Sequence, residues 1–160
     1  MRVLIVEDDD QKRADIEEFV VEYYAVDELI TARSFKSGLR SIVESRPDYV
    51  FLDMTMRNFD RTLTEDGGRP HPFAGREILR QMHRAGIKTP VLVITHFDRF
   101  GEEANYMTLD ELRQELSSRF SNYIGTVHYR SNVDDWKPAL AELIGDSLPR
   151  RGADDIGLGG

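Results

Sequence analysis

Five short apolar runs alternate along the chain with stretches of helical periodicity, and this alternation restricts the fold more than any other feature. Short, continuous apolar runs are typical of strands in a parallel sheet that is buried on both faces. Strands that alternate with helices predict βα units and therefore an α/β domain. The runs occupy residues 3–6, 29–32, 49–52, 91–95 and 123–127.

The stretches between the runs place their apolar residues on one side of a helix. Thr108 and Glu111 form a capping-box pattern at the start of one helix, and Gly145 predicts the end of the last. Pro138 fits that last helix only within its first turn. The apolar sets, one for each helix, are Ile16, Phe19, Val20 and Tyr23; Phe35, Leu39, Ile42 and Val43; Ile78, Leu79 and Met82; Leu109, Leu112, Leu116 and Phe120; and Trp136, Leu140, Leu143 and Ile144.

We therefore expect a doubly wound, five-stranded parallel sheet with helices on both faces. Right-handed crossovers leave few topologies, and the flavodoxin-like strand order 2-1-3-4-5 is a common one. A chain of 160 residues fits one domain, which we assign to residues 1–146. Residues 147–160 are rich in glycine and charge, and we expect them to form a flexible tail.

Composition argues against several classes of protein. The net charge is −8, from 29 acidic residues against 21 lysines and arginines, so we expect no direct contact with nucleic acid. No apolar run approaches the roughly 20 residues of a membrane span, and the N-terminus lacks a signal-peptide pattern. The absence of cysteine suits a reducing compartment. We expect a cytoplasmic protein without a membrane segment.

Acidic or hydroxyl side chains follow three of the predicted strands. Ligands of open α/β sheets bind at the carboxyl ends of the strands, so these groups converge if the first and third strands are neighbours. Each alone has a structural explanation as a helix cap, a turn residue or strand filler, but together they favour a site. Two carboxylates can hold Mg²⁺, and a carboxylate can itself become an aspartyl phosphate. The residues are Glu7, Asp8 and Asp9 after the first strand, Asp53 after the third and Thr95 at the end of the fourth.

Four stretches resemble the receiver domain of two-component response regulators. They are VLIVEDD at the first strand, RPDYVFLDMTM at the third, GREILRQM at the third helix and TPVLVIT at the fourth strand. The resemblance covers residues 1–146 and rests on the order and strand placement of these motifs together. It implies a stand-alone response regulator with self-catalysed phosphotransfer and dephosphorylation rather than a turnover enzyme.

The resemblance also implies a role for each matching residue. Asp53 would accept a phosphoryl group from a histidine kinase or a phosphotransfer protein, and the Thr95 hydroxyl would contact the phosphoryl oxygens. Asp8 and Asp53 would bind Mg²⁺, with Glu7 beside them acting through water and the backbone carbonyl of Thr55 as a further ligand. The signal would pass to an unidentified downstream protein by protein–protein contact. The resemblance is also compatible with a homodimer.

The chain departs from the family pattern after the third and fourth strands. A long connection over residues 57–74 replaces the usual short loop to Gly75, and we expect it to be unstructured. It is interpreted as a lid or partner epitope, with a mobile surface insertion as the alternative. His96 stands where the family has a small residue and would restrict access to the site. The spacing of His71, His96 and His128 does not indicate a metal site.

A third departure is the missing lysine at the end of the fifth strand. One register puts Thr126 at that position and another puts Tyr129 there, and neither side chain carries a positive charge. A charged hydrogen bond is about twice as strong as a neutral one, so the phosphoryl group needs another cation. Arg130 or an arginine in residues 57–74 is the expected substitute.

Other functions remain as alternatives. A pseudo-receiver would keep the fold and bind a partner without phosphorylation; the missing lysine favours it, and the acidic pair Asp8 and Asp53 opposes it. A haloacid-dehalogenase-type phosphatase would leave Asp53 idle, and the motif DMT does not fit a toprim-type nuclease. A flavin site is disfavoured because four acids after the first strand would repel its phosphate.

Overall fold

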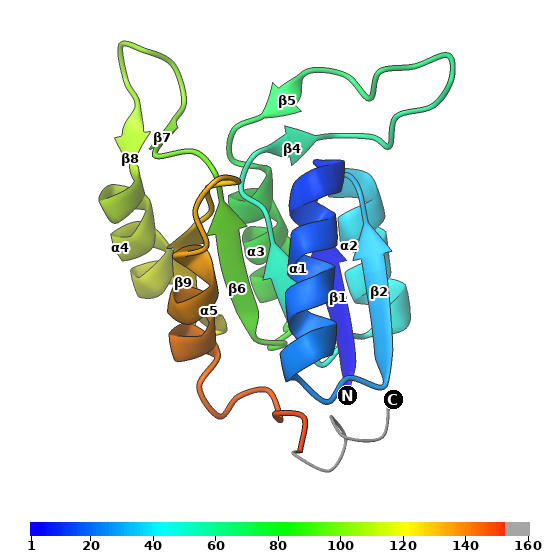
Figure 1. Cartoon of the computed structure of the whole chain (residues 1–160). Coiled ribbons are helices and arrows are strands. Elements are labelled where there is room, and N and C mark those ends of the chain that lie inside the picture. The colour runs from blue at the N-terminus through cyan, green and yellow to red at the C-terminus, as the bar shows by residue number, and fades with distance from the viewer. Residues whose placement is uncertain (153–160) are drawn as a thin grey trace.

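A five-stranded parallel sheet forms the centre of the structure, a computed structural model that describes residues 1–152 (Figure 1). The strand order is β2-β1-β3-β6-β9, which confirms the predicted order 2-1-3-4-5. All five predicted strands are present, and three of them are one residue longer than predicted. Their bounds are β1 Arg2–Val6, β2 Glu28–Ala32, β3 Tyr49–Leu52, β6 Val91–Thr95 and β9 Tyr123–His128.

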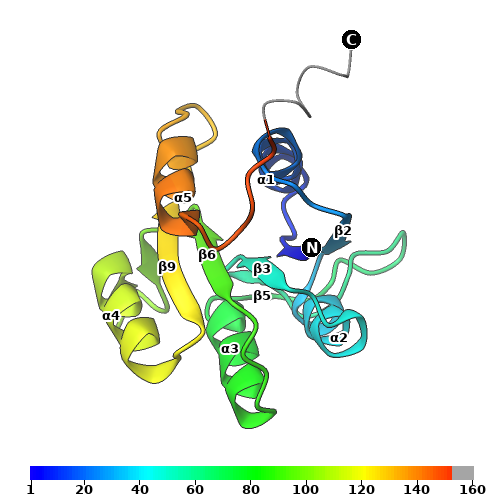
Figure 2. The ribbon, with the colours of Figure 1, turned by 90° about the horizontal axis from the view of Figure 1, so that it is seen from below.

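Helices cover both faces of the sheet, as predicted (Figure 2). Val3 and Ile5 of β1 pack with the helices of one face, and Leu4 and Val6 pack with those of the other. Both faces are therefore apolar, and this burial explains the continuous apolar run. One face carries α1 (Asp10–Tyr23) and α5 (Trp136–Ile144), and the other carries α2 (Phe35–Ser45), α3 (Ala74–Arg84) and α4 (Leu109–Arg119).

Polar caps set the starts of three helices. The Asp9 side chain accepts a hydrogen bond from the Lys12 N–H at 2.8 Å and begins α1. Ser34 caps α2, and the predicted capping box of Thr108 with Glu111 begins α4. At the other end of the chain, α5 ends at Gly145 as predicted, and Pro138 lies in its first turn.

Two small hairpins stand on the carboxyl edge of the sheet, above the strands in Figure 1. One pairs β4 (Met56–Arg57) with β5 (Pro70–His71). The prediction that the 57–74 connection is unstructured was therefore wrong. This connection also contacts α2, where the Lys36 N–H donates to the Asn58 carbonyl at 3.0 Å. The other pairs β7 (Arg99–Phe100) with β8 (Met107–Thr108) and was not predicted. Strands of two residues are too short to leave a periodic pattern.

The chain after α5 returns to the end of α1. Leu148 is buried, and the Ala25 N–H donates to the Pro149 carbonyl at 2.8 Å. The Arg151 N–H donates to the Tyr23 carbonyl at 2.9 Å. This part of the predicted tail therefore packs on the domain, and residues 153–160 lie outside the described residues. No helix within residues 1–152 is long and apolar enough to cross a membrane.

Candidate functional site

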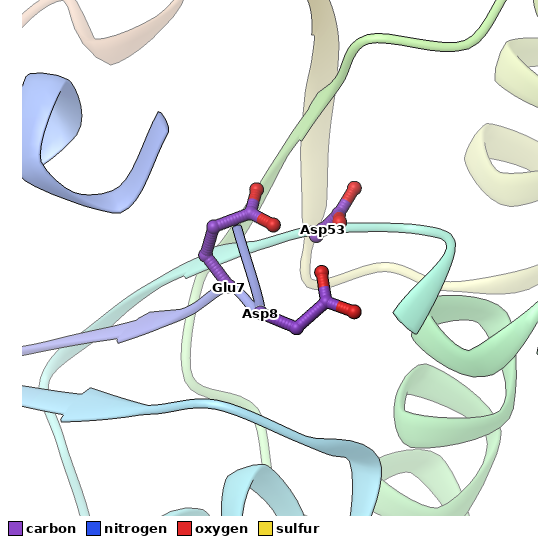
Figure 3. Close-up of side chains that lie close together, drawn as sticks. All are labelled: Glu7, Asp8 and Asp53. Atoms are coloured by element: carbon purple, nitrogen blue, oxygen red, sulfur yellow. The ribbon is translucent and has the colours of Figure 1, made fainter. Parts of the chain in front are cut away.

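Three carboxylates meet where β1 and β3 end side by side. The strands pair with Val6 opposite Leu52, and the Asp53 N–H donates to the Val6 carbonyl at 3.0 Å. Glu7, Asp8 and Asp53 each place one oxygen within 4.8 Å of the others (Figure 3). The convergence expected of Asp8 and Asp53 is confirmed, because the strand order makes β1 and β3 neighbours.

Asp53 combines one fully bonded oxygen with one free oxygen. Its Oδ1 accepts hydrogen bonds from the Met54 N–H at 2.8 Å and from Lys12 Nζ at 3.1 Å. Its Oδ2 is buried and has no hydrogen-bond partner within residues 1–152. A buried acceptor without a donor is costly, and a bound cation or a covalent bond to this oxygen would remove that cost.

The start of α3 packs closely against the backbone of Asp53 and Met54. The Gly75 N–H donates to the Met54 carbonyl at 2.9 Å. A Cβ atom on Gly75 would lie only 2.5 Å from the Asp53 carbonyl oxygen, so a side chain there would force the two segments apart. Gly75 therefore lets α3 approach the end of β3 closely.

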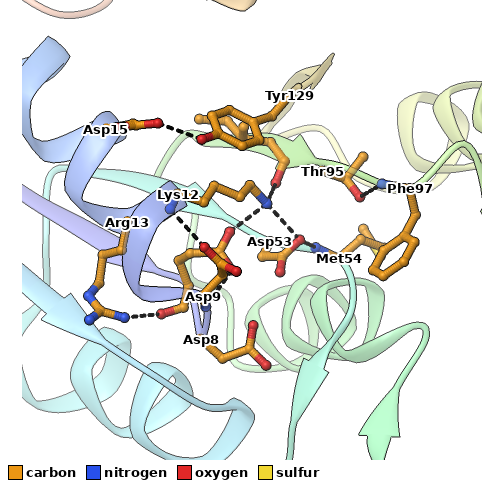
Figure 4. A network of polar contacts seen from close by, with 12 residues as sticks. Asp8, Asp9, Lys12, Arg13, Asp15, Asp53, Met54, Thr95, Phe97 and Tyr129 are labelled. Atoms are coloured by element: carbon orange, nitrogen blue, oxygen red, sulfur yellow. Dashed lines mark hydrogen bonds and ion pairs between the residues drawn. The ribbon is translucent and has the colours of Figure 1, made fainter. Parts of the chain in front are cut away.

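Lys12 is a site residue that the sequence analysis missed. It lies in the first turn of α1, and its side chain is 1% exposed. Nζ lies 2.5 Å from Glu7 Oε1 and donates to Asp53 Oδ1 and to the Ile94 carbonyl at 2.7 Å (Figure 4). Lys12 lies one turn before Ile16 on the apolar stripe of α1, and this position could have indicated that its side chain is buried.

Burial and like charge together perturb the acidic residues. Burial, the largest cause, raises the pKa of Glu7 from 4.5 to about 8; Asp53 adds to the rise and Lys12 opposes it. Burial also raises the pKa of Asp8 and of Asp53. Burial alone would lower the pKa of Lys12, but its attraction to Asp53 and Glu7 together raises it. Lys12 is therefore a permanent cation between the carboxylates.

The donor set fits Mg²⁺. Three carboxylates supply the hard oxygen ligands that this ion prefers, and the free Asp53 Oδ2 is among them. Asp8 is held in place because its Oδ2 accepts the Arg57 N–H at 3.3 Å. The Thr55 hydroxyl donates to the Pro72 carbonyl at 3.1 Å and orders the backbone after Asp53. The role of the Thr55 carbonyl as a ligand stays a prediction.

Thr95 and His96 lie at the carboxyl end of β6, beside the site. Thr95 is fully buried at the end of β6, and its hydroxyl accepts the Phe97 N–H at 3.2 Å. His96 is exposed and lines an open cleft with Asp8 and Thr55. The cleft walls desolvate part of the imidazole and lower the pKa of His96, and the nearby Lys12 lowers it further. His96 therefore supplies bulk at the cleft rather than positive charge.

The structure decides between the two registers for the fifth strand. Tyr129 follows β9 directly; its N–H donates to the Thr95 carbonyl at 2.8 Å and its hydroxyl donates to Asp15. Thr126 lies inside β9, hydrogen-bonded to Tyr123. Tyr129 therefore occupies the strand end beside the site.

Neither Arg130 nor Arg57, two of the arginines considered as substitutes for the missing lysine, is paired with Asp53 in this structure. Arg130 pairs with Asp135, and Arg57 in the 57–74 connection donates to the Gly68 carbonyl. Among the ion pairs of residues 1–152, only that of Lys12 includes Asp53. The role of Arg130 or of an arginine in residues 57–74 toward a phosphoryl group stays a prediction, and the cation beside Asp53 in this structure comes from α1.

The fold and the site together define an α/β domain with a carboxylate cluster at the switch point of its sheet. No protein-family model matches the chain. The chain is 36% identical over 143 residues to "Uncharacterized protein y4jR" of Sinorhizobium fredii, covering 88% of this chain and 94% of that one. It is 28% identical over 147 residues to "Detocs response regulatory protein DtcB" of Enterobacter cloacae, covering 90% of this chain and 98% of that one.

Solved receiver domains share the fold. The response regulator TrrA of Thermotoga maritima, solved in complex with Mg²⁺ and BeF, superposes with a TM-score of 0.56 at 21% identity, covering 89% of this chain and 97% of that one. The chain therefore has the fold of the response-regulator receiver domains. The resemblance inferred from its motifs is thereby confirmed.

Proposed function

We propose that this receiver domain accepts a phosphoryl group on Asp53 in a reaction that requires Mg²⁺. The observation that carries the proposal is the free, buried Oδ2 of Asp53, which lies within a cluster of carboxylates that fits the metal. A histidine kinase or a phosphotransfer protein is the proposed donor. The phosphorylated domain would then signal in the cytoplasm through contact with a downstream protein.

The proposed reaction is a direct transfer. A carboxylate oxygen of Asp53 forms a bond to phosphorus while the bond between phosphorus and the donor's leaving group breaks, and that leaving group departs with the electron pair. Mg²⁺ held by Glu7, Asp8 and Asp53 would neutralise charge on the phosphoryl oxygens. The Thr95 hydroxyl, which accepts the Phe97 N–H at the end of the neighbouring strand β6, would donate to a phosphoryl oxygen.

Intact-mass spectrometry tests the proposal. The purified chain, incubated with acetyl phosphate and Mg²⁺, should gain the mass of one phosphoryl group, and the Asp53→Asn variant should gain none. Chelating the metal should also prevent the gain. A wild type that gains no mass would instead indicate a pseudo-receiver, which acts as a protein-interaction module without phosphorylation.

Metal binding should depend on pH because Glu7 must lose its proton to face a cation. The raised pKa of about 8 means that the folded protein holds this proton at neutral pH, whereas the unfolded chain has lost it. Without metal, stability should therefore fall as the pH rises from 4.5 towards 8. The rise in melting temperature caused by Mg²⁺ should be larger at about pH 8.5 than at about pH 6.5.

Two variants separate the contributions to this effect. Asp8→Asn should abolish the rise in melting temperature, since it removes a ligand. Glu7→Gln should keep part of the rise but lose its dependence on pH. A rise of equal size at both pH values in the wild type would contradict a protonated Glu7, and an unchanged rise in Asp8→Asn would remove Asp8 from the ligand set.

A further inference from the structure

The fixed cation beside Asp53 comes from the first turn of α1. The three N–H groups of an ammonium can make three hydrogen bonds, and Lys12 Nζ has three oxygen partners, on Glu7, Asp53 and Ile94. These partners belong to the ends of β1, β3 and β6, so the ammonium lies among three strand ends (Figure 4). Its position is therefore set by the sheet as well as by the helix.

The surroundings of Lys12 hold it in place. Its own N–H donates to the capping side chain of Asp9, which ties its backbone to the helix start. Nζ lies 5.9 Å from the centre of the Tyr129 ring, and the Tyr129 hydroxyl is bonded to Asp15 in the next turn of the same helix. A lysine held in this way loses little conformational freedom when it binds a new anion.

Phosphorylation of Asp53 would change the balance of charge around Lys12. Two buried carboxyl groups, those of Glu7 and Asp53, lie beside one ammonium, and the raised pKa of Glu7 keeps it largely protonated at neutral pH. Phosphorylation of Asp53 adds about one further negative charge, because a phosphate charge of about −2 replaces the single carboxylate charge. In a buried site this added charge is costly without a cation. Lys12 is the cation already within hydrogen-bond distance of the carboxyl that would carry it.

We propose that Lys12 binds the phosphoryl group on Asp53 and stabilises its transfer. The inference rests on the proposed function and names the group that supplies the fixed positive charge. The phosphoryl group would be attached to a carboxyl whose Oδ1 already accepts from Nζ, so its oxygens lie within reach of the same ammonium. Lys12 keeps its protons throughout and donates N–H groups to the phosphoryl oxygens.

Phosphorylation rates of three variants test the proposal. With acetyl phosphate and Mg²⁺, Lys12→Gln should gain the phosphoryl mass roughly 10- to 100-fold more slowly than the wild type, the loss expected for one charged hydrogen bond. Lys12→Arg, which keeps the charge, should be slowed less. Lys88→Gln removes an exposed lysine outside the site and should match the wild type. The melting temperature of each variant shows whether it is folded.

A measurement on the wild type keeps the proposal testable if Lys12→Gln does not fold. In NMR spectra of protein with ¹³C-labelled lysine, the side-chain signal of Lys12 should shift when the phosphoryl mass appears. The signals of the other three lysines should not shift. Equal rates for folded Lys12→Gln and wild type, or an unmoved Lys12 signal in phosphorylated protein, would overturn this inference alone. A wild type that gains no mass would overturn the proposed function first. The lysines are Lys12, Lys36, Lys88 and Lys137.

Discussion

Replacing Lys12 with methionine is expected to lower the free energy of unfolding by about 3–5 kcal/mol, the usual cost of removing one partner of a buried ion pair. Methionine has a similar length, so the loss reports charge rather than a cavity. Glu7 and Asp53 would remain buried without their counter-ion, and the Ile94 carbonyl would lose its donor. Urea unfolding, with the midpoint and slope measured together, gives the free energy.

The pH dependence of this loss provides a second check. Without Lys12, the pKa of Glu7 and that of Asp53 should rise further, so the folded protein holds more protons than the unfolded chain and loses stability as the pH rises. Adding Glu7→Gln and Asp53→Asn to Lys12→Met should recover most of the loss. Lys88→Met is the matched control, because Lys88 is exposed. A loss below about 1 kcal/mol would show that the buried pair is not a strong interaction.

Truncating Trp136 to alanine is expected to cost about 3–5 kcal/mol, the range found for large aromatic residues in a core. Trp136 is 2% exposed, and its ring centre lies 5.7 Å from that of Phe19 and 5.4 Å from that of Tyr129. It therefore joins α5 to α1 and supports the tyrosine beside Lys12. A loss of this size is a large part of the roughly 5–15 kcal/mol that holds a domain folded.

The neighbouring Tyr23 provides the control for Trp136. Its ring lies 5.2 Å from that of Phe19 but is half exposed, so Tyr23→Ala should cost much less. Chemical denaturation of both variants under one buffer gives the comparison. Similar losses for the two substitutions would mean that the aromatic cluster does not depend on Trp136.

The parts of the fold that sequence predicts best are those with a strong local pattern. A strand buried on both faces, such as β1, must be apolar at every position, and this leaves a continuous run. The capping box of Thr108 and Glu111 is equally local. The meeting of Asp8 with Asp53 followed from strand order alone, because parallel strands end at one edge of the sheet.

The parts that sequence does not predict depend on side-chain reach and on very short elements. Lys12 was overlooked because a long lysine side chain at a helix start usually extends into solvent, whereas here its ammonium crosses the site to Asp53. The choice between Thr126 and Tyr129 required the pairing of β9 with β6, whose register shifts after Val91. An irregular pairing of this kind leaves no sign in either strand alone.

The identity of the phosphorylated residue is tested most directly by reductive mapping. After treatment with acetyl phosphate and Mg²⁺, borohydride reduces an aspartyl phosphate to homoserine, and peptide mass spectrometry locates the product. We expect homoserine at position 53 in the wild type and none in the Asp53→Asn variant. A reduced residue at Asp8 or Glu7, or a stable phosphate on a hydroxyl such as that of Thr95, would contradict Asp53 as the phosphoacceptor.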